Sequence, residues 1–198
     1  MDIFERMLLD NKAWASEMVE INPAYFRRLS KDQTPKVLWL GCSDSRVPAE
    51  IVVNAEPGEM FVHRNIANQI NPADKNVLSV LEYALKVLEV EHIVVCGHYG
   101  CGGVLAAMAA PNPELTTVNL WLEGVRETYL SHAEQLETLN DQSQKIQRLV
   151  ELNVLRQLQT LSSLPIMHNS WGSHQRPKLH GCVYGLEDGM IKVIDHAQ

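Results

Sequence analysis

The chain has 198 residues, 45% hydrophobic and 21% charged, and its 17 basic and 24 acidic residues give a net charge of −7. These values are typical of one globular domain, with or without added arms, and exclude a disordered or collagen-like chain. An acidic chain without a basic block is a poor candidate for binding nucleic acid, and no apolar run is long enough to predict a membrane span. The N-terminus lacks the pattern of a signal peptide, so we expect a cytoplasmic protein. In that reducing compartment, four cysteines and eight histidines call for a metal or redox explanation.

The first half of the chain alternates between helical patterns and short apolar runs. Apolar residues at three-to-four-residue spacing predict a helix from Phe4 to Ile21, and Pro23 begins a second short helix. Buried strands are predicted over 37–40 and 92–96, with another strand over 59–63, and an amphipathic helix over 76–88 leads from the latter to the strand over 92–96. Strand, helix and strand in this order form a right-handed crossover unit.

The second half is predicted to be more helical. A helix over 103–110 is followed by two long amphipathic helices, over 118–139 and 144–161. We then expect a strand over 165–171 and a pair of strands over 179–186 and 190–194. The predicted fold class is α/β: a single domain with a central, mostly parallel β-sheet flanked by helices, and an N-terminal helical arm.

Two of the predicted strands end in loops that carry metal-ligating side chains. Cys42 and Asp44 follow the first strand, and His98 and Cys101 follow the strand over 92–96. Because ligands gather beyond the carboxyl ends of parallel strands, these four side chains would meet if the two strands lie close together in the sheet. Two thiolates, an imidazole and a carboxylate suit Zn²⁺, which prefers sulfur and nitrogen ligands in tetrahedral geometry.

Asp44 decides between two kinds of zinc site. As a fourth ligand it would close the site, as in structural zinc, whereas catalytic zinc keeps one position for water. Arg46 is near enough in the sequence to hold Asp44 in a bidentate pair, away from the metal. Beside three zinc ligands, we favour this catalytic arrangement over a simple salt bridge within the loop.

Three segments resemble the signature segments of the β-class carbonic anhydrases, with features of the bacterial, bicarbonate-regulated type II subset. They are CSDSRVP over 42–48, HRNIAN over 63–68 and GHYGCGG over 97–103. The resemblance covers nearly all of residues 1–198 as one domain, with a helical arm over 1–34 and a zinc-binding α/β core over 35–198. It implies the reversible hydration of carbon dioxide to bicarbonate and a proton, with one Zn²⁺ per subunit.

The resemblance also assigns roles to individual residues. Cys42, His98 and Cys101 would bind zinc. Asp44 and Arg46 would form the dyad that receives the proton and gates the metal, and Asp44 would itself bind zinc only in a closed, inactive state. The substrate cleft, at a dimer interface, would be lined at the matching positions by Gln33, Phe61, Ile66 and Tyr83.

A regulatory site and a set of partners are implied in the same way. Some members of the family bind bicarbonate at a non-catalytic site, and the matching positions are Trp39, Arg64, Tyr184 and Val47. Bicarbonate and low pH would favour the closed state. The implied partners are carbon dioxide or bicarbonate and further copies of the chain, in a homodimer and a dimer of dimers, without nucleic acid or membrane.

Two other functions compete with carbon dioxide hydration. If Asp44 closed the metal permanently, the chain would be a zinc-stabilised bicarbonate sensor or scaffold, and the presence of Arg46 argues against this. The same fold could act on carbonyl sulfide or carbon disulfide, which are linear like carbon dioxide, but nothing in the sequence favours them. Cys96 and Cys182 are expected to be structural residues of the sheet.

Overall fold

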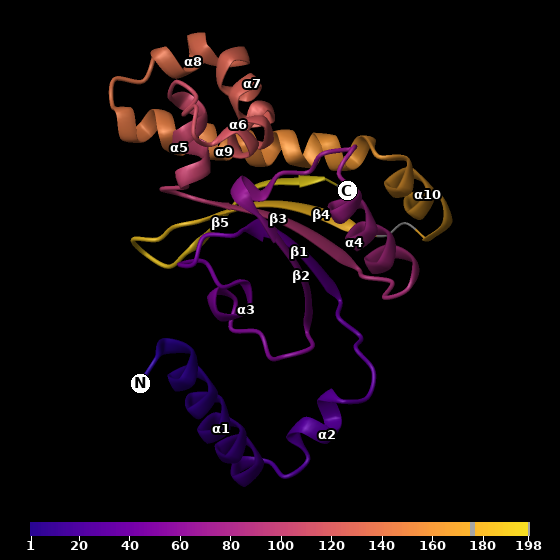
Figure 1. The fold of residues 1–198 in the computed structure, drawn as a ribbon. Coiled ribbons are helices and arrows are strands. Elements are labelled where there is room, and N and C mark those ends of the chain that lie inside the picture. Colours follow the sequence, from indigo (N-terminus) through magenta and orange to yellow (C-terminus); the bar gives the residue numbers. More distant parts are fainter. Residues whose placement is uncertain (175–176, 198) are drawn as a thin grey trace. The chain divides into compact units, whose positions relative to one another are not determined.

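The structure is a computed structural model that describes residues 1–174 and 177–197 (Figure 1). The chain divides into two units, Met1–Thr34 and Pro35–Gln198. The first unit contains helix α1 (Ile3–Ile21) and helix α2 (Tyr25–Leu29). Trp14 of α1 packs edge-on against Phe26 of α2, with ring centroids 5.6 Å apart, so aromatic contacts join the two helices.

The second unit is built on a five-stranded sheet with the order β2-β1-β3-β4-β5. β1 pairs in parallel with both β2 and β3, β3 pairs in parallel with β4, and β5 is antiparallel to β4. The strands are β1 (Val37–Cys42), β2 (Met60–Asn65), β3 (His92–His98), β4 (Lys178–Tyr184) and β5 (Ile191–Ala197). This mostly parallel sheet confirms the predicted fold class, and it places the ends of β1 and β3 side by side.

Helices cover both faces of the sheet. Helix α9 runs across one face and packs mainly on β3 and β4, whereas α3 lies on the opposite face (Figure 1). The helical segments are α3 (Ala49–Val52), the 3₁₀ turn η1 (Ile66–Asn68), α4 (Lys75–Lys86), α5 (Gly102–Met108), α6 (Thr116–Trp121), α7 (Glu123–Ser131), α8 (Ala133–Glu137), α9 (Gln142–Ser163) and α10 (Pro165–His174). The larger core cluster lies between the sheet and α4, α5 and α9. A smaller cluster on the α3 side contains Trp39, Ala49, Cys96 and Cys182.

Helix α9 packs directly on the backbone of the sheet because glycines face it. A Cβ on Gly97 of β3 would lie 2.8 Å from Val154 Cγ2, and one on Gly181 of β4 would lie 2.5 Å from Leu158 Cδ1. Both distances are shorter than carbon–carbon contact allows. The close approach fixes α9 over the strand that ends at His98.

Two predicted elements differ from the structure. Residues 165–171, expected as a strand, belong to helix α10. Pro165 is its first residue, a position where the missing N–H has no helical partner to lose. The single helix expected over 118–139 is instead the three helices α6, α7 and α8, interrupted at Leu122 and His132. At the second break His132 Nδ1 lies 2.9 Å from the carbonyl oxygen of Thr128, so the side chain satisfies a group at the helix end.

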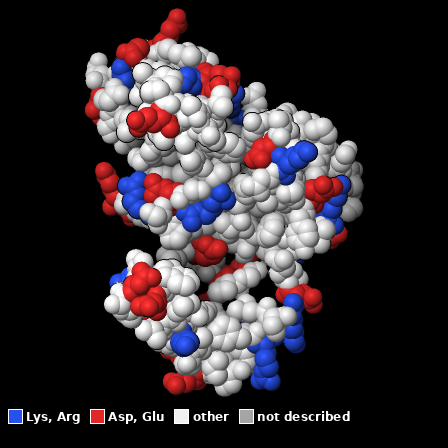
Figure 2. All heavy atoms as spheres, viewed as in Figure 1, with Lys and Arg blue, Asp and Glu red and all other residues white. Residues whose placement is uncertain are grey.

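The surface and the helices bear on possible partners. Within residues 1–174 and 177–197, no helix is long and apolar enough to cross a membrane. On the face shown in Figure 2, lysine and arginine are interspersed with aspartate and glutamate and separated by uncharged surface. That face therefore offers no continuous basic stripe of the kind that follows a nucleic-acid backbone.

Candidate metal centre

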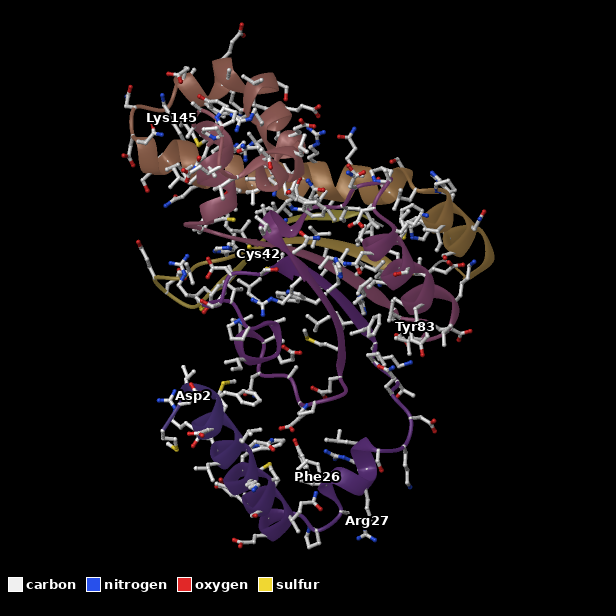
Figure 3. The ribbon with its side chains drawn as sticks, in the orientation of Figure 1. Asp2, Phe26, Arg27, Cys42, Tyr83 and Lys145 are labelled. Atoms are coloured by element: carbon white, nitrogen blue, oxygen red, sulfur yellow. The ribbon has the colours of Figure 1, made fainter. Side chains whose placement is uncertain are left out.

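The ends of β1 and β3 bring three metal-ligating side chains together, as the sequence predicts. Cys42 ends β1 (Figure 3), His98 ends β3, and Cys101 is the residue before helix α5. The Cys42 and Cys101 sulfur atoms lie 3.9 Å apart, and the ligand atoms of all three residues lie within 4.8 Å of one another. All three side chains are buried, so solvent water does not readily form hydrogen bonds with them.

His98 is oriented as a metal ligand would be. Its Nδ1 lies 3.1 Å from the carbonyl oxygen of Tyr99 and donates its hydrogen there, which leaves the lone pair on Nε2. Nε2 is buried and has no hydrogen-bond partner among the residues that the structure describes. A buried polar atom without a partner is unfavourable, and two sulfurs with this nitrogen form a donor set that Zn²⁺ prefers. The residues therefore fit a zinc ion.

The contact between the two thiols of the cluster shifts their pKa values in opposite directions. The hydrogen bond from Cys101 lowers the pKa of Cys42 to about 4, although burial opposes this, and the same contact raises the pKa of Cys101. The backbone N–H groups of Asp44 and Ala67 also lower the pKa of Cys42, and those of Gly103 and Val104 in the first turn of α5 lower the pKa of Cys101. These N–H groups favour the thiolate form, which is the form that binds metals.

Asp44 is held by Arg46 at the edge of the ligand cluster. Arg46 Nε donates to Oδ1 at 2.9 Å and Nη2 donates to Oδ2 at 2.7 Å, which is the bidentate pair expected from the sequence. The side-chain hydrogen bond from Arg46 holds the pKa of Asp44 well below its usual range. Asp44 Oδ2 lies 3.7 Å from His98 Nε2, beyond hydrogen-bond distance. Arg46 Nη2 also donates to Gly100 O at 3.3 Å, so the pair is tied to the loop that carries Cys101.

The predicted cleft residues fall in three places. Ile66 borders the Cys101 loop, since a Cβ on Gly103 would lie 3.0 Å from Ile66 Cγ2. Phe61 and Tyr83 pack on each other with ring centroids 5.8 Å apart, Phe61 near the start of β2 and Tyr83 on α4 (Figure 3). Gln33 belongs to the N-terminal unit. The core therefore places Ile66 beside the ligand loops and places Phe61 toward the opposite end of β2.

Two of the predicted regulatory residues, Trp39 and Arg64, lie beside Gly41, and a third lies on β4. Trp39 is buried, and its Nε1 lies 2.5 Å from the point where a Cβ on Gly41 would stand. Arg64 stands opposite Gly41 in the pairing of β1 with β2. Tyr184, on β4, packs against the same small core cluster as Trp39. The Trp39 indole therefore occupies the space that a side chain at position 41 would fill, while Arg64 donates to the backbone that follows Gly41.

Arg64 is bonded to the loop that carries the dyad. Its Nε donates to the carbonyl oxygen of Cys42 at 2.8 Å and its Nη2 to that of Asp44 at 2.5 Å. The N–H of Val47 donates to the same Asp44 carbonyl at 3.1 Å. Arg64 and Val47 therefore both hold the backbone of Asp44 in the arrangement in which its side chain pairs with Arg46.

Comparison with known proteins agrees with this site. A family model described as carbonic anhydrase matches residues 37–191. The chain belongs to the carbonic anhydrase family. It is 39% identical over 188 residues to a carbonic anhydrase of Emericella nidulans, covering 95% of this chain and 82% of that one. It is 37% identical over 183 residues to one of Pseudomonas aeruginosa, covering 87% and 79%.

Solved structures place this carbonic anhydrase in the β class. A β-carbonic anhydrase of Sordaria macrospora, from a pair described as tetrameric, superposes with a TM-score of 0.94 at 35% identity and 98% coverage of both chains. A Coccomyxa β-carbonic anhydrase in complex with acetazolamide gives 0.92 at 34% identity, covering 100% of this chain and 89% of that one.

One part of this carbonic anhydrase's site was not predicted from the sequence. Three buried amide side chains, Gln69, Asn153 and Gln157, bond to each other and to the backbone beside Cys42. A signal was present, because Asn153 and Gln157 lie four residues apart on the face of α9 that is otherwise apolar. Buried polar residues at that spacing indicate a bonded cluster.

Proposed function

We propose that the chain catalyses the zinc-dependent, reversible hydration of carbon dioxide to bicarbonate and a proton, with one Zn²⁺ per subunit bound by Cys42, His98 and Cys101. The observation that supports this most directly is the buried, unbonded Nε2 of His98 beside two thiols, with Asp44 held off the cluster by Arg46. A zinc ion bound there would act as a Lewis acid and lower the pKa of water toward neutrality.

Asp44 and Arg46 would orient the reacting water. Both oxygens of Asp44 accept hydrogen bonds from Arg46, so the carboxylate is fixed at the rim of the cluster and has lone pairs left for a water proton. Because the Arg46 hydrogen bond lowers the pKa of Asp44, this carboxylate accepts a hydrogen bond but does not retain the proton, which passes to solvent. The pair also leaves one position of the cluster open for water, as a catalytic zinc site requires.

The direct test is a stopped-flow assay of carbon dioxide hydration at alkaline pH with zinc-loaded protein. We expect a fast reaction that is lost when a chelator removes zinc and restored when zinc is returned. No acceleration by the zinc-loaded protein would overturn the proposal and favour a sensor or scaffold. Carbonyl sulfide and carbon disulfide, added as competing substrates, would reveal a different substrate preference.

We further infer that bicarbonate inhibits the enzyme at the site formed by Trp39, Arg64 and Tyr184, as in the bicarbonate-regulated subset. An anion there would compete for Arg64, which now donates to the carbonyl oxygens of Cys42 and Asp44. Loss of these bonds would free the loop around Val47, so that Asp44 could leave Arg46 and bind the metal. Low pH would favour the same closed state, in which Asp44 would bind the metal as a carboxylate, since its pKa lies well below its usual range.

The variant Trp39→Phe tests this regulation. Removing the indole N–H takes away a hydrogen bond to an anion, which is worth about 1.5–3 kcal/mol. The bicarbonate concentration for half-inhibition should therefore rise at least about tenfold. Activity should also extend to lower pH. Trp171→Phe is a matched control, since Trp171 lies on α10, outside this cluster, and its indole donates to the carbonyl oxygen of Pro177. Identical bicarbonate inhibition and pH profiles in Trp39→Phe and the wild type would refute the assignment.

We also propose a homodimer and a dimer of dimers. The arm exposes a large apolar surface on α1, which a partner subunit would cover, and the S. macrospora relative is described as tetrameric. In such a dimer, Gln33, Phe61, Ile66 and Tyr83 would line the substrate cleft at the interface. The four cysteines are free thiols, which supports the cytoplasmic location that we propose.

A further inference from the structure

The turn beside Cys42 contains an alanine in an unfavourable conformation. Ala67 has φ 60° and ψ 31°, in the left-handed region that residues with a Cβ seldom adopt. The following residue, Asn68, also has a positive φ of 45°. This turn carries the chain from the end of β2 and packs against β1, which ends at Cys42, and the Ala67 N–H is one of the backbone groups that lower the pKa of Cys42.

Hydrogen bonds hold the peptides on both sides of Ala67. The carbonyl oxygen of Ile66 accepts from Trp121 Nε1 at 2.8 Å, which orients the peptide that carries the Ala67 N–H. The carbonyl oxygen of Ala67 itself accepts from Asn153 Nδ2 at 3.0 Å and from Gln69 Nε2 at 2.8 Å. The conformation of Ala67 is therefore imposed by side chains, two of them far away in the sequence.

Asn153 is the centre of this amide cluster. Its Oδ1 accepts from Gln69 Nε2 at 2.8 Å and from Gln157 Nε2 at 3.0 Å. Gln157 Oε1 in turn accepts from the N–H of Ile70 at 2.8 Å, just beyond the turn. Asn153 and Gln157 are 1% and 2% exposed, so neither amide can exchange these partners for water. The cluster joins helix α9 to both ends of the strained turn.

The amides do what apolar residues at the same positions would not. Neighbouring residues of α9 are buried leucines and valines, so packing alone does not call for amides there. Amides give direction: each bond fixes the plane of a particular peptide. The peptide fixed by Asn153 adjoins the one whose N–H meets a proposed metal ligand.

We infer that Asn153 is a positioning residue of the metal centre, which by holding the Ala67 carbonyl aims the Ala67 N–H at the Cys42 sulfur. The inference rests on the proposed zinc site. A hydrogen bond to the thiolate disperses its charge and fixes the direction of its remaining lone pairs. Mutation of a residue that supports a metal ligand from outside the coordination sphere commonly lowers metal affinity about 10–100-fold.

The test is the rate of zinc release from the zinc-loaded full chain into an excess of a chromogenic chelator. Asn153→Ala should release zinc about tenfold faster than the wild type or more. The control is Leu161→Ala, which removes a fully buried side chain from the same helix but leaves the amide cluster in place. It separates a general loss of stability from a loss at the metal. If Asn153→Ala released zinc no faster than Leu161→Ala, the positioning role would be refuted.

A second comparison tests the route through Ala67. Glycine adopts positive φ without steric cost, so in an Ala67→Gly chain the conformation of the turn depends less on the hydrogen bonds from Asn153. In that background, Asn153→Ala should accelerate zinc release by a smaller factor than in the wild type, and an equal factor would overturn the inference. Asn153→Ser supplies the same comparison should Asn153→Ala fail to fold.

The cobalt-substituted protein adds a readout other than affinity. The thiolate-to-cobalt absorption of Asn153→Ala should shift from that of the wild type, whereas Leu161→Ala should keep the wild-type spectrum; an unshifted Asn153→Ala spectrum would contradict the inference. A wild-type chain that binds no zinc would overturn the proposed metal centre together with this inference. A zinc-binding wild type with unaffected Asn153 variants would overturn the inference alone.

Discussion

Replacing Cys101 with serine is expected to remove zinc from the protein and to reduce carbon dioxide hydration to the uncatalysed rate. A serine hydroxyl does not ionise near neutral pH and is a poor zinc ligand compared with a thiolate. With the sulfur lost, only Cys42 and His98 of the buried cluster remain, and two ligands do not hold Zn²⁺ in tetrahedral geometry. Zinc content after gel filtration, measured by atomic absorption beside the stopped-flow rate, gives both results from one preparation.

Cys96→Ser is the matched control for this variant. It makes the same sulfur-to-oxygen change in a thiol that is also buried, on β3, where Cys96 donates to the carbonyl oxygen of Gly97 at 3.3 Å. Burial raises the pKa of Cys96, so it is a protonated core thiol and not a ligand. We expect it to retain one zinc per chain. A Cys101→Ser protein with full zinc content and full activity would show that the ligand assignment is wrong.

The variant Arg46→Ala should keep its zinc and yet lose most of its activity, by about a hundredfold or more. The three proposed ligands do not include Arg46, so the metal stays bound. What changes is Asp44, which loses two side-chain hydrogen bonds and becomes free to turn toward the metal ligands, of which His98 Nε2 lies 3.7 Å from Asp44 Oδ2. The reacting water would lose both its acceptor and its place.

An assay at alkaline pH separates two possible effects of the Arg46 substitution on Asp44, a change in its ionisation and a change in its position. Without Arg46 the pKa of Asp44 rises toward its usual value near 4, so Asp44 remains ionised at alkaline pH in both proteins. Activity lost there reports the position of the carboxylate. Arg46→Lys keeps the positive charge but not the bidentate contact, and its activity should fall between those of the wild type and Arg46→Ala. Arg126→Ala, which removes an arginine bonded to the carbonyl of Ala109, is the control, and near-normal rates in Arg46→Ala would remove the dyad from the mechanism.

The sheet and the ligand trio were predictable because their signals are local. Short apolar runs ending at Gly41 and Gly97 mark β1 and β3 as buried strands, and polar loops follow both. Parallel strands then bring those loops to one edge, which places Cys42 near Cys101 without further information. The pairing of Asp44 with Arg46 followed from a separation of two residues.

Features that depend on distant parts of the chain were not predictable in this way. The apolar residues after Pro165 fit a strand or a helix equally, and the choice is made by packing beside α9. The left-handed conformation of Ala67 has no signal in its own residue type, because alanine normally avoids it. The Ala67 carbonyl oxygen is bonded to Asn153, 86 residues further along the chain. Tertiary bonds of this kind become visible only in the folded molecule.

The sequence separation of Cys42 and Cys101 has a consequence for the stability and cellular lifetime of the protein. Cys42 and Cys101 are separated by 59 residues, and a zinc ion between them would close that whole length of chain into a loop. Such a closure restricts the unfolded chain more than the folded one, so bound metal would also act as a covalent-like cross-link of the sheet. Zinc deficiency would then do more than abolish enzyme activity. It would leave a chain that opens more readily and is degraded sooner, so that enzyme abundance follows zinc supply.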